Sequence, residues 1–251
     1  MLAGSIPLLA QKAGELEIRV IYDNTSARAG VQEDWGYSAV VTFRGRRLLF
    51  DSGTKPELFV ENLKKLDVAP ASIEKAMISH EHPDHRNGIY LFYPMHKGLP
   101  VYFLDSFEKP AWDEAAKIGM TPVRVTGPQE LLPGMFTTGT VEGEPNEQSL
   151  AVETSKGIVM MVGCSHPGVV KMVQAVQKQR GKNSIRLLIG GFHMFRQEEA
   201  QIARQIEELR KLNVQTVRPA HCTGDLAHSL FEKAWGAGYG KAGAGNIIRL
   251  E

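Results

Sequence analysis

A cluster of histidines in the first half of the chain constrains the fold more than any other feature. Residues 79–85 read Ser-His-Glu-His-Pro-Asp-His, and they follow the apolar run 76–78, which is typical of the end of a buried strand. In an extended segment, side chains two positions apart project to the same side, so His80 and His82 are expected to point together. The sequence therefore predicts a pair of convergent imidazoles where this strand ends.

The second half of this stretch supplies a carboxylate and another imidazole. Pro83 turns the chain, and Asp84 and His85 follow as a second pair. Imidazole nitrogen and carboxylate oxygen are ligands of zinc, iron and manganese. Four such ligands in one loop exceed what one tetrahedral ion with an open position needs, so we predict two adjacent metal ions. A solvated loop rich in histidine is the alternative, but the chain has 8 histidines in 251 residues and three of them fall here.

Composition indicates an ordinary globular protein. The chain is 43% hydrophobic and 23% charged, and 29 basic against 28 acidic side chains give a net charge of +1. This balance argues against a nucleic-acid or membrane surface, so an anionic substrate would have to be held by local features. The length fits one domain over residues 1–251, with halves at roughly 15–140 and 141–251.

The cysteines and the N-terminal residues bear on the cellular compartment. Cys164 and Cys222 each lie within two residues of a histidine, so proximity to a metal explains them better than a disulfide framework does. We therefore expect a reducing compartment and a cytoplasmic location. Residues 1–14 lack a basic start and are too short to span a bilayer. We expect them to be flexible or a trimmed leader, with an exported form as the less favoured alternative.

Apolar periodicity predicts strands, helices and hairpins in both halves of the chain. The Pro-rich and Gly-rich stretch 105–147 is expected to form short strands and a long surface excursion that shapes a substrate mouth. The other expected strands are 17–22, 75–79, 99–104, 185–189 and 216–218, with hairpins of 37–43 with 47–50 and of 148–154 with 157–162, and the expected helices are 56–66, one beginning at 87, 168–180 and 197–212.

Three strands of the second half are each followed by a histidine: His166, His193 and His221. Ligands of α/β proteins are bound beyond strand ends, where glycine lets the backbone approach closely. A lone histidine in such a place is usually a hydrogen-bonded surface residue. Three of them, all among Gly, Ser or Cys, favour one shared site near residues 80–85. His96 and His228 lack this context and are interpreted as surface or helix residues.

The pattern His-x-His-x-Asp-His after an apolar strand resembles that of the metallo-β-lactamase superfamily. Further motifs are Gly-Cys-Ser-His-Pro-Gly, Gly-Gly-Phe-His and Pro-Ala-His-Cys-Thr-Gly, with Asp-Asn early in the chain and Asp-Ser-Gly before the first expected helix. They resemble one branch, the metal-dependent hydrolases similar to dihydropterin-ribofuranosylaminobenzene 5′-phosphate synthase. The resemblance runs from about residue 18 to the C-terminus. It implies an αββα sandwich, an α/β fold of two mixed β-sheets with helices outside and a dinuclear metal site at one edge.

The resemblance also implies roles for the residues that match the superfamily pattern. His80 and His82 would bind the first metal ion. Asp84 and His85 would bind the second, and His221 matches the final histidine ligand of that second ion.

The chain departs from the wider superfamily at residues 164–166, where most members have a bridging aspartate. We expect His166 to be a ligand of the first metal ion. Cys164 is either a thiolate ligand or, as we favour, a small buried residue, and Cys222 is expected near the metals or the substrate. His193 either completes a metal site or donates to a substrate phosphate. Asp51 matches the acid that braces the histidine loop and fixes ring orientation.

These residues predict a metal-dependent hydrolase, or a related transferase, that acts on a small phosphorylated or ester substrate. Two divalent ions, zinc by preference and iron or manganese as alternatives, would supply a metal-activated hydroxide. Asp84 would orient the hydroxide, and His193 would donate to the developing oxyanion. We expect the substrate to be anionic, because one ligand carboxylate among neutral imidazoles leaves the charge of two ions largely uncompensated.

Two other functions stay open on the sequence. One is a di-iron redox protein, although Glu81 does not replace a histidine of the motif and the chain has no room for a flavodoxin-like extension. The other is a non-catalytic metal-binding or sensor protein of the same fold. A nuclease is disfavoured by the balanced charge. No feature of the sequence indicates an oligomeric state.

Overall fold

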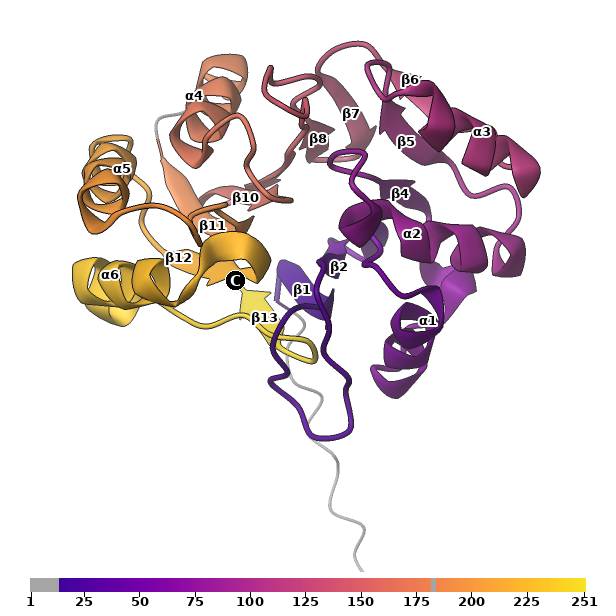
Figure 1. Ribbon diagram of the computed structural model, residues 1–251, viewed down its shortest axis with the longest axis horizontal. Coiled ribbons are helices and arrows are strands. Elements are labelled where there is room, and N and C mark those ends of the chain that lie inside the picture. The colour runs from indigo at the N-terminus through magenta and orange to yellow at the C-terminus, as the bar shows by residue number, and fades with distance from the viewer. Residues whose placement is uncertain (1–13, 182–183) are drawn as a thin grey trace, which may run out of the picture.

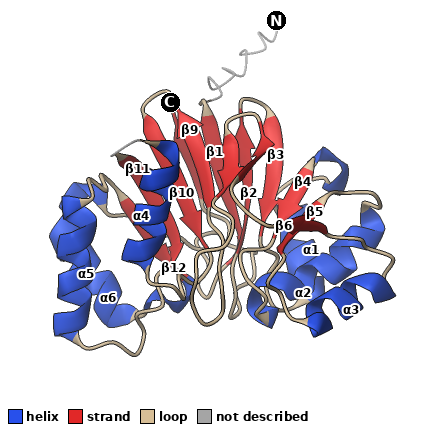
Figure 2. Cartoon of the chain, turned by 90° about the horizontal axis from the view of Figure 1, so that it is seen from above, coloured by secondary structure: helices blue, strands red, loops and turns tan. Residues whose placement is uncertain are grey.

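Two mixed β-sheets lie face to face in the computed structural model, and helices cover the outer face of each sheet (Figure 1 and Figure 2). The structure describes residues 14–181 and 184–251, so the expected leader 1–14 lies almost entirely outside the described residues. The expected αββα sandwich is confirmed.

Each half of the chain contributes most of one sheet. The chain passes from the first sheet to the second between β6 and β7, and β13 then returns to pair with β1. The seven-stranded sheet contains, in spatial order, β13 (Ile247–Leu250), β1 (Leu16–Tyr22), β2 (Ser38–Phe43), β3 (Arg46–Phe50), β4 (Lys75–Met77), β5 (Val101–Leu104) and β6 (Val123–Val125). The six-stranded sheet contains β12 (Val217–Ala220), β11 (Ile185–Gly191), β10 (Gly157–Val162), β9 (Leu150–Thr154), β8 (Met135–Thr137) and β7 (Gln129–Leu132).

Helices pack on the outside of both sheets. The first group is α1 (Pro56–Lys65), α2 (Pro83–Phe92) and α3 (Lys109–Lys117), and the second is α4 (Val169–Arg180), α5 (Glu199–Lys211) and α6 (Asp225–Trp235) (Figure 2). In the part of the chain that the structure describes, no helix is long and apolar enough to cross a membrane.

The sequence of β10 shows why a wholly apolar run forms a strand here. Val159 and Met161 belong to the buried cluster that joins the two sheets, whereas Ile158, Met160 and Val162 belong to the cluster under α4, α5 and α6. Successive side chains of a strand point to opposite faces, so a strand covered on both faces is apolar at every position. Burial of each such side chain contributes about 1.5–3 kcal/mol.

The topology brings the ends of several strands to one place. β10, β11 and β12 are parallel neighbours, so their C-terminal ends lie at the same edge of the six-stranded sheet. β3 and β4 are parallel in the other sheet, and the residues after them, Asp51 and Ser79, lie close together. This edge therefore gathers loops from both sheets.

Several expected elements differ from the structure. The helix expected to begin at 87 begins at Pro83 instead, because proline suits the first position of a helix, where its missing N–H is not needed. Asp84 and His85 thus belong to the first turn of α2. The stretch 105–147 contains the helix α3, whose buried positions Ala111 and Ala115 give only a weak apolar pattern. Helix α6 and strand β13 were not predicted.

Candidate metal centre

The first group of candidate ligands consists of His80, His82 and His166. The first two precede α2, and the third follows β10, yet their ligand nitrogens all lie within 4.8 Å of one another. Nε2 of His80 faces Nδ1 of His82 at 3.2 Å. Nε2 of His166 is buried and has no hydrogen-bond partner among the described residues. Three imidazole nitrogens gathered in this way fit one divalent metal ion.

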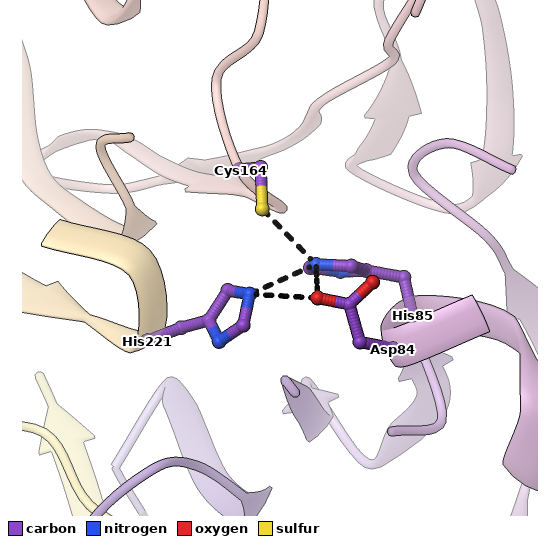
Figure 3. A group of neighbouring side chains, drawn as sticks. All are labelled: Asp84, His85, Cys164 and His221. Carbon is purple, nitrogen blue, oxygen red and sulfur yellow. Dashed lines mark hydrogen bonds and ion pairs between the residues drawn. The ribbon is translucent and has the colours of Figure 1, made fainter. Parts of the chain in front are cut away.

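The second group consists of Asp84, His85, Cys164 and His221 (Figure 3). Nε2 of His85 lies 3.2 Å from Sγ of Cys164 and 3.3 Å from Nε2 of His221. Oδ2 of Asp84 lies 3.3 Å from Nε2 of His221. A carboxylate, a thiol and two imidazoles are a suitable tetrahedral donor set for zinc, so the geometry favours Cys164 as a candidate ligand over the small buried residue that the sequence favours. These distances confirm that strand-end histidines converge on the loop of residues 80–85.

The imidazoles are oriented by contacts outside the two groups. A histidine that binds a metal usually has its other ring nitrogen hydrogen-bonded, which fixes the tautomer and the ring position. Three of the site histidines have such a contact, and in each case Nε2 is left to face the other candidate ligands. The pairs are Nδ1 of His80 with Oγ of Ser79 at 2.9 Å, Nδ1 of His85 with Oδ2 of Asp51 at 2.7 Å, and Nδ1 of His221 with Oδ1 of Asn24 at 2.9 Å.

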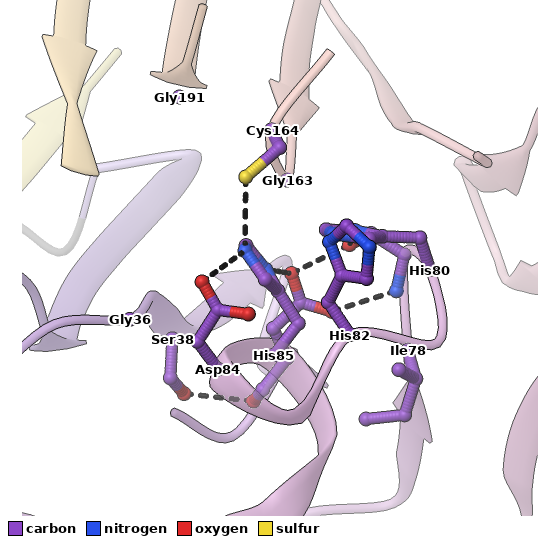
Figure 4. A network of polar contacts seen from close by, with 12 residues as sticks. Gly36, Ser38, Ile78, His80, His82, Asp84, His85, Gly163, Cys164 and Gly191 are labelled. Carbon is purple, nitrogen blue, oxygen red and sulfur yellow. Dashed lines mark hydrogen bonds and ion pairs between the residues drawn. The ribbon is translucent and has the colours of Figure 1, made fainter. Parts of the chain in front are cut away.

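Asp51 anchors the histidine loop through hydrogen bonds. Figure 4 shows part of the polar network around that loop. The carboxylate is fully buried and accepts hydrogen bonds from the backbone N–H and the hydroxyl of Ser79, at 2.6 and 2.8 Å. Its contact with His85 then connects the loop to the first turn of α2. One buried carboxylate thus positions residues of both candidate ligand groups.

Glu147 positions the loop after β10 in the same way, and no feature of the sequence indicates this role. Its buried carboxylate accepts hydrogen bonds from four consecutive backbone N–H groups, those of residues 163–166, at 2.9–3.0 Å. Cys164 and His166, one from each ligand group, lie in this segment. A single acid in a Pro-rich and Gly-rich stretch carries no local signal of such a contact.

The backbone is strained at this edge. Asp51, Ser165, His193 and His221 have φ values of 54°, 64°, 50° and 47°. Residues other than glycine adopt a positive φ at a cost on the order of 1–3 kcal/mol each, so the surrounding contacts must enforce this backbone conformation. Such strain is typical of functional sites.

Burial and neighbouring charges shift the pKa values of the site residues in different directions. Burial and the nearby imidazoles lower the pKa of His166 to about 3. Burial opposes protonation of His85 too, but the charge and hydrogen bond of Asp51 outweigh it and raise the pKa of His85 to about 9. Burial would raise the pKa of Asp84, yet its contacts with His221 and His85 hold it below the usual range.

The third group brings His193 to the two cysteines. Sγ of Cys164 lies 3.2 Å from Sγ of Cys222, and both are free thiols. The ring of His193 lies 4.4 Å from that of His166 between centroids, and its ligand atom lies within 4.8 Å of both sulfurs. His193 therefore lies beside the two ligand groups, and Cys222 contacts the site through Cys164.

The two remaining histidines lie in other surroundings. Nε2 of His96 is 2.9 Å from the carbonyl oxygen of Ile73, so its N–H donates there. His228 lies on α6, where Nδ1 is 3.0 Å from the hydroxyl of Tyr239.

Trp35 is a site residue that sequence reasoning missed. Its Nε1–H donates a hydrogen bond to Oδ2 of Asp84, and its ring centroid lies 4.9 Å from that of His221. Gly36 has a φ of 142°, and a Cβ there would lie 2.6 Å from the carbonyl oxygen of Asp84. The loop could not be recognised from the sequence because Trp35 and Asp84 are far apart along the chain.

Comparison with known proteins identifies the family. A solved metal-dependent hydrolase of the β-lactamase superfamily is 25% identical and superimposes with a TM-score of 0.77, covering 94% of this chain and 99% of its own. A relative from Methanocaldococcus jannaschii, 7,8-dihydropterin-6-methyl-4-(β-D-ribofuranosyl)-aminobenzene-5′-phosphate synthase, is 30% identical over an alignment of 249 residues, and the alignment covers 82% of this chain and 85% of the relative. The chain belongs to the metallo-β-lactamase superfamily. The resemblance to the synthase-like branch is also confirmed.

A solved structure with lower sequence identity supports only a shared fold. Human tRNase Z, short form, is 13% identical with a TM-score of 0.58, covering 94% of this chain and 99% of its own. No protein-family model matches the sequence. The superfamily relatives support a metal-dependent enzyme, and the His, Asp and Cys groups described above are its candidate ligands.

Proposed function

We propose that this member of the superfamily is a metal-dependent hydrolase, or a related transferase, acting on a small phosphorylated or ester substrate. The observation that carries the proposal is the presence of two adjacent ligand groups at one edge of the sandwich. The groups are His80, His82 and His166, and Asp84, His85, Cys164 and His221.

Two divalent ions, zinc by preference, would activate a water molecule there and neutralise the oxygens of an ester or phosphoryl group. The residues of the chain supply the rest of the chemistry. Asp84 would orient the nucleophile while it serves as a ligand. Asp51 and Glu147 keep the ligand loops in place by the hydrogen bonds described above.

His193 is the proposed donor to the substrate. The hydrogen bond with Cys222 raises the pKa of His193, which favours the protonated ring. Its Nδ1 is buried without a hydrogen-bond partner among the described residues, and the ring lies next to His166. A protonated imidazole in this place would stabilise the negative charge that develops on a substrate oxygen.

The charge of the centre favours an anionic substrate. Asp84 and a Cys164 thiolate together would compensate only part of the charge of two divalent ions, and the other candidate ligands are imidazoles. The name of the M. jannaschii relative describes a phosphorylated product, which supports the same class of ligand. We do not propose a nucleic acid, because the net charge of the chain is +1. Because a thiol ligand has to stay reduced, we also propose a cytoplasmic location.

Kinetics on matched substrates test this function. The zinc-loaded protein is assayed with bis(4-nitrophenyl) phosphate, 4-nitrophenyl phosphate and a neutral lactone, each with and without inorganic phosphate. We expect turnover of a phosphate ester in preference to the lactone, and competitive inhibition by phosphate. Faster turnover of the lactone, without inhibition by millimolar phosphate, would refute the proposal.

A further inference from the structure

A cavity of about 650 Å³ lies directly beside the second ligand group. His221 contributes to both, since it is a candidate ligand and also lines the cavity. Helix α6 forms one wall of the cavity. The other walls come from the loop after β1, from Trp35 and Phe195, and from the segment that follows α6. A substrate whose reacting group lies at the ligands can therefore extend into this space.

Two exposed aromatic rings form one side of the cavity. Trp35 is 47% exposed and Phe195 is 42% exposed, and their ring centroids are 6.0 Å apart at an interplanar angle of 76°. Large exposed rings at the wall of a cavity are typical of ligand sites, because a flat ligand ring removes their apolar surface from water. This side of the cavity fits an aromatic group.

The α6 side of the cavity is acidic. Asp225 and Glu232 are seven positions apart, so they lie on the same helix face, with His228 between them, and all three line the cavity. Neither carboxylate forms an ion pair with another described residue. Burial lowers the pKa of His228, so this ring is neutral and does not compensate them. Lys241 is the basic side chain of the lining.

We propose that this cavity binds the part of the substrate that does not react, and that this part is an aromatic group carrying N–H donors and no negative charge. Carboxylates accept hydrogen bonds and repel anions, so Asp225 and Glu232 would select for amino or amide groups and against acids. The proposal rests on the proposed function, in which the ligand groups take the anionic end. Opposite charge at the two ends then fixes the direction in which the substrate binds.

Three non-hydrolysable probes that differ in one substituent test the proposal: phenylphosphonate, 4-aminophenylphosphonate and 4-carboxyphenylphosphonate. Their dissociation constants are measured by titration calorimetry on the zinc-loaded protein. We expect the amino compound to bind tightest and the carboxy compound weakest, with about a tenfold difference between those two. Equal affinity for these two, or tighter binding of the carboxy compound, overturns the proposal.

Variants show whether the α6 carboxylates cause the ranking. In the double variant Asp225→Asn with Glu232→Gln, the dissociation constant of the carboxy compound divided by that of the amino compound should fall to about one. Glu207→Gln on α5 makes the same change of charge outside the cavity and should keep the ratio. If the double variant does not fold, Glu232→Gln alone replaces it in this measurement. We expect the single variant to reduce the ratio in part. An unchanged ratio in a folded carboxylate variant overturns the proposal.

Binding and turnover separate this inference from the proposed function. If the probes bind in the expected order but no phosphate ester is hydrolysed, the cavity assignment holds and the hydrolase proposal fails. If phosphate esters are hydrolysed but the three probes bind equally, the hydrolase proposal holds and the cavity assignment fails.

Discussion

The indole Nε1–H of Trp35 donates a 2.8 Å hydrogen bond to Oδ2 of Asp84. Trp35 also lines the cavity beside α6, and Asp84 belongs to the second ligand group. One side chain therefore contacts both the space proposed for the substrate and a proposed metal ligand. This relationship lets the indole N–H be tested separately from the aromatic ring.

Trp35→Phe keeps an aromatic ring but removes the N–H group. Loss of a hydrogen bond to a ligand typically costs about 10–100-fold in metal affinity, so we expect the second group to bind zinc more weakly by that factor. The affinity of the first group should not change. Competition with a chromophoric chelator measures both affinities.

Trp112→Phe is the matched control for that experiment. The indole of Trp112 donates to the carbonyl oxygen of Phe107 near α3, and Trp112 is not among the candidate ligands or the cavity lining. Equal zinc affinities in Trp35→Phe and the wild type would contradict the positioning role. An equal loss in both variants would do so as well.

Metal binding at the second group should depend on pH through His85. Its pKa of about 9 means that the ring is protonated at pH 7 in the metal-free protein, so zinc must displace that proton. Affinity should therefore rise with pH through this pKa, and it should keep rising above it, because burial raises the pKa of the Cys164 thiol and zinc displaces that proton as well. His166, with a pKa of about 3, has no proton to lose at neutral pH.

Calorimetry in buffers of different ionisation enthalpy counts the protons released per zinc ion. We expect release at pH 7 from the second group, and less release in Asp51→Asn, because the neutral amide no longer favours protonated His85. Zinc binding at the second group without any proton release at pH 7 would show that His85 carries no proton for zinc to displace.

The ligand loop was predictable because its residues are adjacent in the sequence. His80, His82, Asp84 and His85 lie within one strand-to-helix connection, and the strand-end histidines could be brought together by the parallel order of β10, β11 and β12. The contacts that orient these residues could not be predicted in the same way. Trp35 and Glu147 act on partners from other loops, and such long-range hydrogen bonds leave no periodic pattern.

The start of α2 and the existence of α6 illustrate two further limits of pattern reasoning. From the sequence, Pro83 indicates a turn, but proline also suits the first position of a helix, which is where the structure places it. In α6, Ala227 and Phe231 are buried at helical spacing, but charged and polar residues interrupt the apolar pattern. The acidic side of the cavity therefore became visible only in the structure.

Glu147→Gln should weaken the loop after β10. An amide can accept fewer hydrogen bonds than a carboxylate, and its NH₂ group would face a backbone N–H. We expect the free energy of unfolding to fall by about 1–3 kcal/mol, measured by chemical denaturation of the metal-free protein. Glu142→Gln changes an exposed acid of the same connection and should have little effect. Equal stability of the two variants would refute this role of Glu147.

Cobalt substitution tests whether Cys164 is a ligand. A thiolate bound to Co²⁺ produces a sulfur-to-metal charge-transfer absorption in the near ultraviolet. We expect this band in the wild type and in Cys222→Ser, and its loss in Cys164→Ser, because Cys164 lies in the second group and Cys222 does not. Persistence of the band in Cys164→Ser would assign the thiolate to Cys222 instead.

The two ligand groups should bind two metal ions, and this is tested by the metal content per folded chain. Elemental analysis is made on the wild type, on His82→Ala and on His96→Ala, a histidine outside both groups. Circular dichroism confirms that each variant is folded. We expect two ions per chain in the wild type and in His96→Ala, and loss of an ion together with metal-dependent activity in folded His82→Ala. Full metal content and turnover in His82→Ala would contradict it.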